Sequence, residues 1–374
     1  MDFALSEHQD MLRSGARDFL SKECPKSLVR EMDEDERNYS RELWAKMAEL
    51  GWMGLLIPEE YGGSGGSFLD MMILLEETGM ACVPVPFFST VILGAMPIMI
   101  AGSKEQKGEY LPQIARGQLV TTLALTEPSA KLDARSIEVT ATKKEGKYLI
   151  EGIKLFVPDA HVSDYMVCVA KTNATEDGIA LFIVDSKDKQ IEYSLLPTIG
   201  CDKLCEVTFS KATVPQSNIL GEGWELVEKI LRYAALAKCA EMIGTSRRVL
   251  EMTVDYAKER VQFGRPIGSF QSIQHHCANM LIEFSPAEVL TYQAAWMMSQ
   301  GLPCATEVAM AKALVGDACT RVCELGHQVH GGVGLTMEHD MQRYYRRVKA
   351  AELSWGDSSY HREMIAQHMD LIAE

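Results

Sequence analysis

The spacing of apolar residues changes twice along this chain of 374 residues, and no other feature limits the fold as strongly. Residues 1–118 have helical spacing, residues 119–222 alternate with a period of two, and residues 223–374 return to helical spacing. Helices and strands that are segregated along a chain indicate an α+β protein. We therefore expect a mainly α chain. It has an N-terminal helical domain, a middle antiparallel β domain and a C-terminal four-helix bundle over those three ranges.

Local start and stop signals place the elements of the first two ranges. Ser6 and Gln9 form the two ends of a capping box, and Ser40 precedes a helix expected over 41–50. The glycine-rich run 61–66 predicts a flexible turn before a helix that begins near Phe68. Strands are expected in the β-branched and aromatic runs 121–125, 136–140, 148–150, 165–169, 179–184 and 206–209.

The last range begins with a very long helix. Helical spacing continues from Gly223 for roughly ten turns, which is too long for a compact monomer unless other helices pack along it. Further helices are expected over 272–300, with a bend at Pro286, and over 306–330, closed by two glycines. A final helix is expected to begin near Asp357, and the bundle suits subunit contacts.

Composition excludes several classes of protein. The net charge of −15 argues against general nucleic-acid binding, because a phosphate backbone would repel the chain. No run of 18 apolar residues predicts a membrane span, and the N-terminus has no secretory pattern. The ten cysteines include no CxxC pair and no paired zinc-ligand spacing, so we expect no metal site. Because no export signal is seen, we expect reduced thiols and a cytoplasmic location.

One corner of the chain carries the most specific chemistry. The segment from Tyr256 to Gln274 ends a long helix in Arg260 and continues Val-Gln262-Phe263-Gly-Arg-Pro. A guanidinium binds pyrophosphate oxygens in a forked geometry that lysine cannot copy. This segment resembles the flavin-site signature of the acyl-CoA dehydrogenase family, in which the arginine contacts the FAD diphosphate of a neighbouring subunit. The resemblance implies that Arg260, Gln262 and Phe263 bind that part of FAD.

Two further segments are similar to elements of the same family. Gln328-Val-His-Gly331-Gly332 looks like its Gln-x-x-Gly-Gly element, whose backbone lies against the adenosine and diphosphate. Adjacent glycines let a backbone approach a ligand closely. Thr126 begins a Thr-Glu-Pro motif, and in the family the backbone groups just before this threonine, here those of Leu125, face the flavin. The next residues depart from the pattern, since Lys-Leu replaces the usual Gly-Ser near the CoA arm.

A fourth segment, 152–160, corresponds to a family stretch that often contains Gly-x-Lys-x-Trp-Ile-Thr. The resemblance places Phe156 at the tryptophan beside the flavin and Pro158 at the threonine that donates to flavin N5. Proline has no hydroxyl and no backbone N–H, so that contact is lost or made differently.

The catalytic base is missing from both positions that the family uses. Trp355 stands where a late loop usually carries glutamate, and Ala234 stands at the alternative position on the long helix. Glu241, two turns beyond Ala234, and Asp357 are the remaining candidates for proton abstraction. The favoured interpretation of Glu241 is a partner for a basic group such as Lys238 or Arg247, and that of Asp357 is a cap of the last helix.

The resemblance covers essentially the whole chain. It implies FAD-dependent α,β-dehydrogenation of an acyl-CoA, with α-proton abstraction and hydride transfer to flavin N5, in fatty-acid or lipid degradation. It also implies an electron-transfer flavoprotein or similar acceptor, and a homo- or hetero-oligomer arranged as a dimer of dimers. Since the diphosphate end is intact and the ring end altered, we expect a subunit of a heteromer that lends its diphosphate-binding corner to a flavin whose ring and base belong to the partner. The resemblance to two-chain members of the family implies a bulky or carboxylated acyl group. The alternatives are an ordinary homotetrameric dehydrogenase, a flavin-dependent oxidase or monooxygenase of the same fold, and a flavin-free partner subunit.

Overall fold

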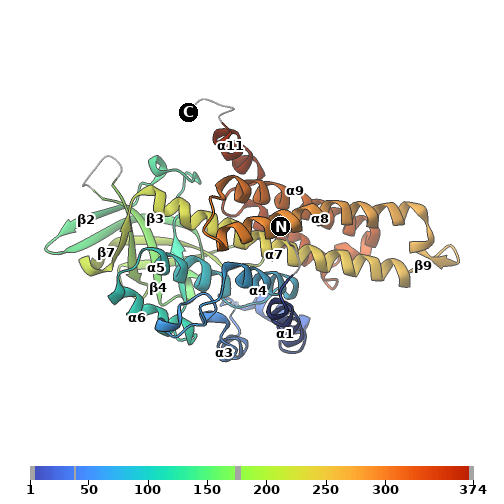
Figure 1. Ribbon diagram of the computed structural model, residues 1–374, viewed down its shortest axis with the longest axis horizontal. Helices are drawn as coiled ribbons and strands as arrows, with labels where there is room; N and C mark the ends of the chain where they lie inside the picture. The colour runs from blue at the N-terminus through green and yellow to red at the C-terminus, as the bar shows by residue number, and fades with distance from the viewer. Residues whose placement is uncertain (1–4, 38, 173–177, 370–374) are drawn as a thin grey trace. The chain divides into compact units, whose positions relative to one another are not determined.

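A computed structural model describes residues 5–37, 39–172 and 178–369. The chain forms two compact units (Figure 1). The first is drawn from Met1–Val29, Phe68–Val83 and Ala235–Glu374, and the second from Arg30–Ser67 and Pro84–Ala234. Each unit therefore combines segments that are far apart in the sequence.

The first unit is helical. Its helices are α1 (Glu7–Glu23), α4 (Phe68–Ala81), α8 (Gln271–Ser299), α9 (Ala305–His330), α10 (Met341–Leu353), α11 (Ser358–His368) and most of α7 (Trp224–Glu259). Helix α9 packs against α8, α10 and α11, and the buried face of α9 explains its strong helical spacing. The predicted bundle is present, and it includes α10, which the sequence analysis did not delimit. Pro286 lies inside α8 without ending it.

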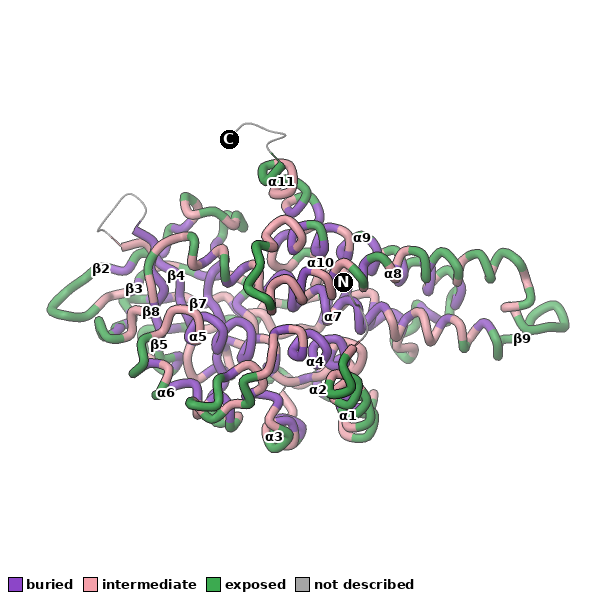
Figure 2. Tube along the Cα trace, in the orientation of Figure 1, coloured by how far each residue is buried: buried purple, intermediate pink, exposed green. Residues whose placement is uncertain are grey.

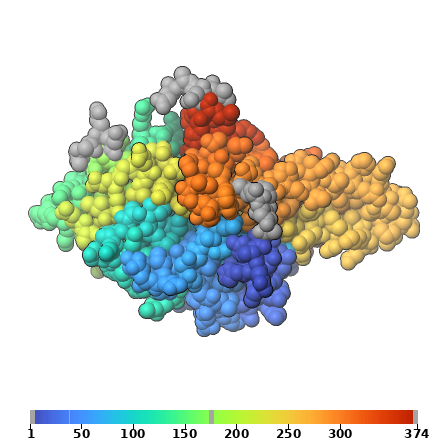
Figure 3. All heavy atoms as spheres, in the orientation of Figure 1, coloured from blue at the N-terminus to red at the C-terminus, as the bar shows by residue number. Residues whose placement is uncertain are grey.

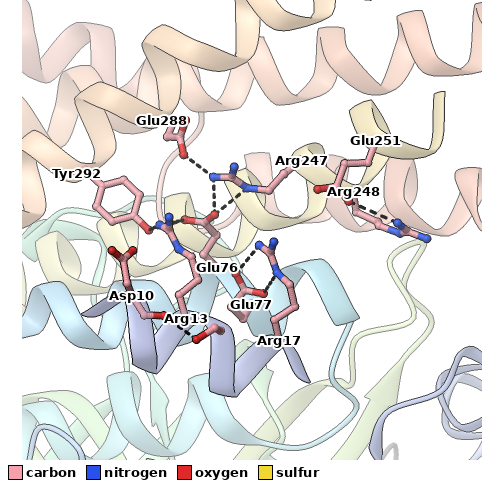
Figure 4. A network of polar contacts seen from close by, with 11 residues as sticks. Asp10, Arg13, Arg17, Glu76, Glu77, Arg247, Arg248, Glu251, Glu288 and Tyr292 are labelled. Atoms are coloured by element: carbon pink, nitrogen blue, oxygen red, sulfur yellow. Dashed lines mark hydrogen bonds and ion pairs between the residues drawn. The ribbon is translucent and has the colours of Figure 1, made fainter. Parts of the chain in front are cut away.

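Polar contacts hold four helices of this unit together (Figure 4). Glu76 of α4 is almost completely buried and accepts from the Arg247 guanidinium of α7 at 2.9 Å and from the Tyr292 hydroxyl of α8. The neighbouring Glu77 binds Arg17 of α1 through two bonds of 2.8 and 3.0 Å. Burial alone would lower the pKa of Arg247, but the carboxylates of Glu76 and Glu288 raise it above its ordinary value. The carboxylates of Glu76 and Glu77 are buried, and each is paired with an arginine that offsets the cost of removing its charge from water.

The second unit contains a sheet in the order β6-β7-β3-β2-β4-β5-β8, with β1 paired to β4. Its strands are β1 (Thr121–Ala124), β2 (Thr140–Lys144), β3 (Lys147–Pro158), β4 (Tyr165–Thr172), β5 (Ile179–Asp185), β6 (Ile191–Leu196), β7 (Leu204–Pro215) and β8 (Ile219–Glu222). Most neighbours are antiparallel, as predicted, while β1 and β2 each pair with β4 in parallel. Alternating side chains of these strands form one apolar core.

One local expectation in this unit is wrong, and another needs refinement. A strand was expected over 136–140, but Asp133 accepts from the Ser136 amide at 3.0 Å and turns the chain, so the strand begins only at Thr140. The run 61–66 forms a turn and the next helix begins at Phe68, as predicted, but backbone bonds hold the turn, since the Gly66 amide donates to the Leu55 carbonyl at 2.7 Å. A Cβ on Gly63 would come within 2.0 Å of the Ile57 carbonyl oxygen. These glycines permit close backbone packing.

Short helices complete the second unit. They are α3 (Arg41–Glu49), a π-helix (Ser89–Ala95), α5 (Met96–Ala101) and α6 (Lys104–Ala115), while α2 (Lys26–Glu34) contains residues of both units. The predicted cap is confirmed, since the Ser40 hydroxyl accepts from the Leu43 amide at 3.3 Å. The capping box of Ser6 and Gln9 at the start of α1 is confirmed as well. No helix in the described ranges is long and apolar enough to cross a bilayer.

The ends of α7 and α8 extend beyond the other helices of the first unit (Figures 1 and 3). A hairpin of β9 (Val261–Gln262) and β10 (Arg265–Pro266) joins them. We call this region the arm. Figure 2 shows that exposed residues cover its outer part. Exposed large apolar side chains of the hairpin and of the first half of α8 are Val261, Phe263, Leu281 and Ile282.

Candidate flavin and acyl-CoA site

The hairpin of the arm has a tight turn at Phe263 and Gly264. Both residues have positive φ, 52° and 78°, as a two-residue turn of type I′ requires. Glycine adopts this conformation without strain, whereas phenylalanine does not. The turn leaves the Phe263 side chain 93% exposed. Phe263 therefore has an unfavourable backbone conformation and a ring exposed to solvent. This combination suits contact with a ligand or another chain.

Arg260 lies where α7 ends. Its amide donates to the Tyr256 carbonyl and its own carbonyl accepts from Ile267, both at 2.8 Å, so the backbone is fixed on both sides. The guanidinium is exposed and makes no ion pair with any residue that the structure describes. Arg265 differs, because its guanidinium lies 4.2 Å from the centroid of the Phe270 ring. Arg260 therefore offers an anchored cation whose fork remains available for a phosphate group.

The Gly331-Gly332 element follows α9. Gly331 has φ 62° and ψ −145°, a conformation that glycine adopts far more readily than other residues. A Cβ on either glycine would meet nothing within 4 Å, so both glycines border open space. Gln328, on the last turn of α9, is exposed. An exposed backbone with no side chain over it fits the close approach of a dinucleotide.

An aromatic stack joins these two segments. The Tyr256 ring lies 4.4 Å from the His330 ring, at an interplanar angle of 18°. His330 Nδ1 lies 2.8 Å from the Gly326 carbonyl oxygen and must donate to it. The sequence analysis missed this stack, although Tyr256 stands one turn before Arg260 and His330 directly before Gly331. Gln262, whose side-chain amide donates to the Val261 carbonyl at 2.8 Å, is exposed in the same arm.

The remaining predicted contacts, Leu125, Thr126 and Phe156, lie in the second unit. The Thr126 carbonyl accepts from the Leu155 amide at 2.8 Å, which places the end of β1 beside β3. Neither the Thr126 amide nor its hydroxyl donates to another residue in the described part of the chain. Leu125 is buried and Thr126 half-buried. Thr126 thus keeps two donors that a ligand with oxygen and nitrogen acceptors can use.

Phe156 occupies a β-bulge. The register between β3 and β7 shifts between Lys154 and Val157, and Phe156 has φ 54°. Its ring is 48% exposed. The carbonyl of Pro158 accepts from the Thr122 hydroxyl at 2.6 Å, and Pro158 has no donor to offer. The exposed Phe156 ring and the unused donors of Thr126 are suited to contact a flavin ring. Pro158 contributes no hydrogen-bond donor to that contact.

A buried ion pair lies beneath this face. The Lys154 ammonium donates to Glu127 at 2.6 Å and to the Leu125 carbonyl at 2.9 Å, and both side chains are inaccessible to solvent. Burial lowers the pKa of Lys154, while Cys168 and Glu127 oppose that change. The sequence analysis quoted both motifs but did not pair their charged residues.

Neither candidate base is a free carboxylate. Glu241 accepts from the Lys238 ammonium one turn earlier on α7. Asp357 caps α11, since its Oδ1 accepts from the Tyr360 amide at 2.7 Å. Ala234 is completely buried. The described residues also contain no group of three or more His, Cys, Asp or Glu side chains that could hold a metal.

The turn at Trp355 and Gly356 is held from two sides. The buried Lys312 ammonium donates to the carbonyls of Glu352 and Gly356, each at 2.8 Å. His361 Nε2 lies 3.0 Å from the Trp355 carbonyl oxygen. Trp355 has φ 60°, so these bonds stabilise a backbone conformation that a tryptophan rarely adopts. No local pattern indicated these contacts.

Models of three consecutive domains of one protein family match this chain in the same order. They are acyl-CoA dehydrogenase N-terminal domain over residues 6–118, middle domain over 122–212 and C-terminal domain over 221–369. A probable acyl-CoA dehydrogenase of Bacillus subtilis, YngJ, is 32% identical over 99% of this chain and all of the relative. The chain belongs to the acyl-CoA dehydrogenase family. It is an FAD-dependent enzyme, and its general reaction is acyl-CoA dehydrogenation.

Two further similarities are informative. The CarC subunit of the caffeyl-CoA reductase-Etf complex of Acetobacterium woodii is 33% identical over 96% of this chain and 98% of the relative. The crystal structure of the ChsE4-ChsE5 complex from Mycobacterium tuberculosis contains a chain that is 27% identical, covers both chains completely and has a TM-score of 0.92.

Proposed function

We propose that this chain is one subunit of a heteromeric, FAD-dependent acyl-CoA dehydrogenase that oxidises the α,β bond of a bulky or carboxylated acyl-CoA. The observation that carries the proposal is the Arg260 guanidinium, which is anchored by its backbone, exposed and without a carboxylate partner in the described residues. Together with Gln262, Phe263, Gln328 and the Gly331-Gly332 backbone, it would hold the diphosphate end of an FAD.

Arg260 of this chain would reach the FAD of a partner chain, and Leu125, Thr126 and Phe156 are proposed to face the ring of a different FAD. Bound FAD would supply the hydride acceptor of the reaction. The exposed Phe156 ring supports stacking beside the flavin, and the Thr126 amide and hydroxyl support hydrogen bonding to it. We also propose domain boundaries at 1–118, 119–222 and 223–374, close to the limits of the three family matches.

The heteromer is proposed because this chain has no free acid at the positions that would carry the base. Residues 234 and 355 are alanine and tryptophan, Glu241 is paired with Lys238, and Asp357 is engaged as a cap. A partner chain would supply the carboxylate that takes the α-proton. The similarity to a chain of the ChsE4-ChsE5 complex supports a two-chain assembly, and the similarity to CarC supports an electron-transfer flavoprotein as the acceptor.

Replacing Arg260 tests the cofactor contact. Arg260→Ala removes a charge-assisted hydrogen bond worth about 1.5–3 kcal/mol, so the affinity for FAD should fall by roughly tenfold to a hundredfold. Flavin fluorescence titration of the assembly formed with the partner chain measures this change. Arg321→Ala is the matched control, because Arg321 is exposed but pairs with Glu324 at 3.0 Å. Equal FAD affinity in Arg260→Ala and Arg321→Ala would contradict the assignment.

Purification tests the heteromer. The chain should be colourless and inactive when produced alone, and yellow and active when co-expressed with a related chain that carries a base. Activity is measured with acyl-CoA and an artificial electron acceptor. A yellow, active protein from the single chain would reject the two-chain proposal, and hydrogen peroxide release would indicate an oxidase instead.

A further inference from the structure

The buried pair of Lys154 and Glu127 connects three segments of the second unit. Lys154 belongs to β3, Glu127 follows β1, and the Glu127 carboxylate accepts from the amides of Glu138 at 2.6 Å and Val139 at 3.2 Å, just before β2. The ammonium also donates to the Leu125 carbonyl at 2.9 Å. One ion pair therefore fixes backbone groups at the end of β1 and just before β2, and it ties both to β3 through the Lys154 side chain.

A buried ion pair of this kind contributes little net stability to a folded protein. Taking two charges out of water is costly, and apolar side chains of similar volume often stabilise a core equally well. The surrounding core of this unit is apolar, including Val139, Ile150 and Val157. An apolar pair could not hold the Leu125 carbonyl or the amides of Glu138 and Val139, because only polar groups direct hydrogen bonds.

The bonded atoms lie next to the residues proposed to face the flavin. Leu125 carries one bonded carbonyl and Thr126 the next, which accepts from the Leu155 amide at 2.8 Å. Lys154 is the last residue in register before the bulge that displays Phe156 with φ 54°. That conformation persists only where neighbouring contacts impose it.

We propose that the Lys154–Glu127 pair is a positioning clamp, which holds Leu125, Thr126 and Phe156 as one preformed surface for the flavin ring. This inference rests on the proposed placement of the ring beside those residues. Both charged groups are buried, so they act through the backbone that they hold and do not touch the ligand. The absorption spectrum and midpoint potential of bound FAD therefore depend on the pair.

The decisive comparison uses single and double variants in the assembly that retains FAD. Lys154→Met and Glu127→Gln each leave one buried group without its partner and should shift the folding equilibrium at least tenfold toward the unfolded state. Lys154→Met/Glu127→Gln removes both charges and should recover most of that loss. The double variant should nevertheless bind FAD at least tenfold more weakly and show a shifted flavin spectrum and potential. Lys187→Met is the matched control, since Lys187 forms an exposed pair with Asp164 in the same unit.

Wild-type FAD affinity, spectrum and potential in the double variant would overturn the clamp. Thr126→Val and Phe156→Ala separate this failure from failure of the proposed site. If those two variants change the flavin spectrum while the double variant does not, the site stands and the clamp is wrong. If none of them changes it, the ring lies elsewhere.

A second measurement needs no variant. A preformed surface requires that the Leu155 amide, bonded to the Thr126 carbonyl, be protected from hydrogen exchange before FAD binds. The wild-type protein stripped of FAD should retain this protection. Rapid exchange of that amide without FAD, followed by protection when FAD is added, would also overturn the proposal.

Discussion

Among single residues, His361 couples protonation to folding through its hydrogen bond to the Trp355 carbonyl. A carbonyl only accepts, so Nε2 carries the proton and donates across 3.0 Å. Burial lowers the pKa of His361 to about 4, while the Trp355 carbonyl and Asp357 raise it and the nearby Lys312 lowers it further. The imidazole is therefore neutral in the folded protein at pH 7.

This arrangement predicts a loss of stability in mild acid. The unfolded chain binds the proton near pH 6.5, whereas the folded chain binds it only near pH 4. Stability should be complete above pH 6.5 and fall as the pH decreases toward 4, by about 3 kcal/mol in total. Urea unfolding at pH 7 and pH 4.5 measures this, and His361→Gln should remove that part of the loss. His8→Gln, at an exposed position, should not. An unchanged pH dependence in His361→Gln would contradict the assignment.

Residues in local motifs could be predicted from sequence, and residues that meet across the fold could not. Asp357 was expected as a possible cap because its carboxylate needs to reach only three residues ahead, and it does. Lys154 lies 27 residues from Glu127, and Lys312 lies 40 and 44 residues from the carbonyls it binds. No periodicity specifies such pairs, because they depend on strand register and helix packing.

At the scale of elements, α4 and α7 cross at two glycines. A Cβ on Gly79 would come within 2.2 Å of the Glu241 carbonyl oxygen, and one on Gly244 within 1.8 Å of the Glu76 carbonyl oxygen. The helices therefore approach backbone to backbone, and the Thr245 hydroxyl reaches the Gly79 carbonyl at 3.2 Å. This crossing brings Glu76 to the arginines of Figure 4.

A methyl group at this crossing should separate the helices. Gly244→Ala gains about 0.5–1 kcal/mol of helix propensity, but overpacking against rigid backbone costs about 1–3 kcal/mol or more, so the variant should be less stable. Gly15→Ala is the control, because a Cβ on Gly15 of α1 would meet nothing within 4 Å. It should raise the free energy of unfolding by about 0.5–1 kcal/mol. Thermal or urea unfolding measures both, and a Gly244→Ala variant as stable as Gly15→Ala would refute the close approach.

The elements themselves show where periodicity is sufficient. Helices α7, α8 and α9 were predicted because each repeats its apolar spacing over many turns. The short strands β6 and β8 and the arginine-rich helix α10 were missed, since few turns or few apolar residues carry their pattern. The run 136–140 has strand-like residues, but the local Asp133 hydrogen bond prevails over that propensity.

At the scale of the whole molecule, the fold class followed from the two changes of period, because these average over a hundred residues and tolerate local errors. The way in which chains assemble is not recorded in any such long-range periodicity. The arm gives the clearest sign of assembly, because Leu281 and Ile282 of α8 are exposed there and Arg260 belongs to the same arm. Exposed apolar side chains gathered on one surface indicate a contact with another chain.

Cofactor binding and assembly should therefore be linked. If Arg260 reaches an FAD held mainly by another chain, each association strengthens the other by the same factor. Ile282→Glu places a charge on the arm at a side chain that is 66% exposed, and it should lower both the mass in sedimentation and the FAD affinity although Arg260 is intact. Met11→Glu, on α1 and 68% exposed, should alter neither. If Ile282→Glu chains separate and still bind FAD with full affinity, one chain holds the whole cofactor. That result would contradict a site shared between chains.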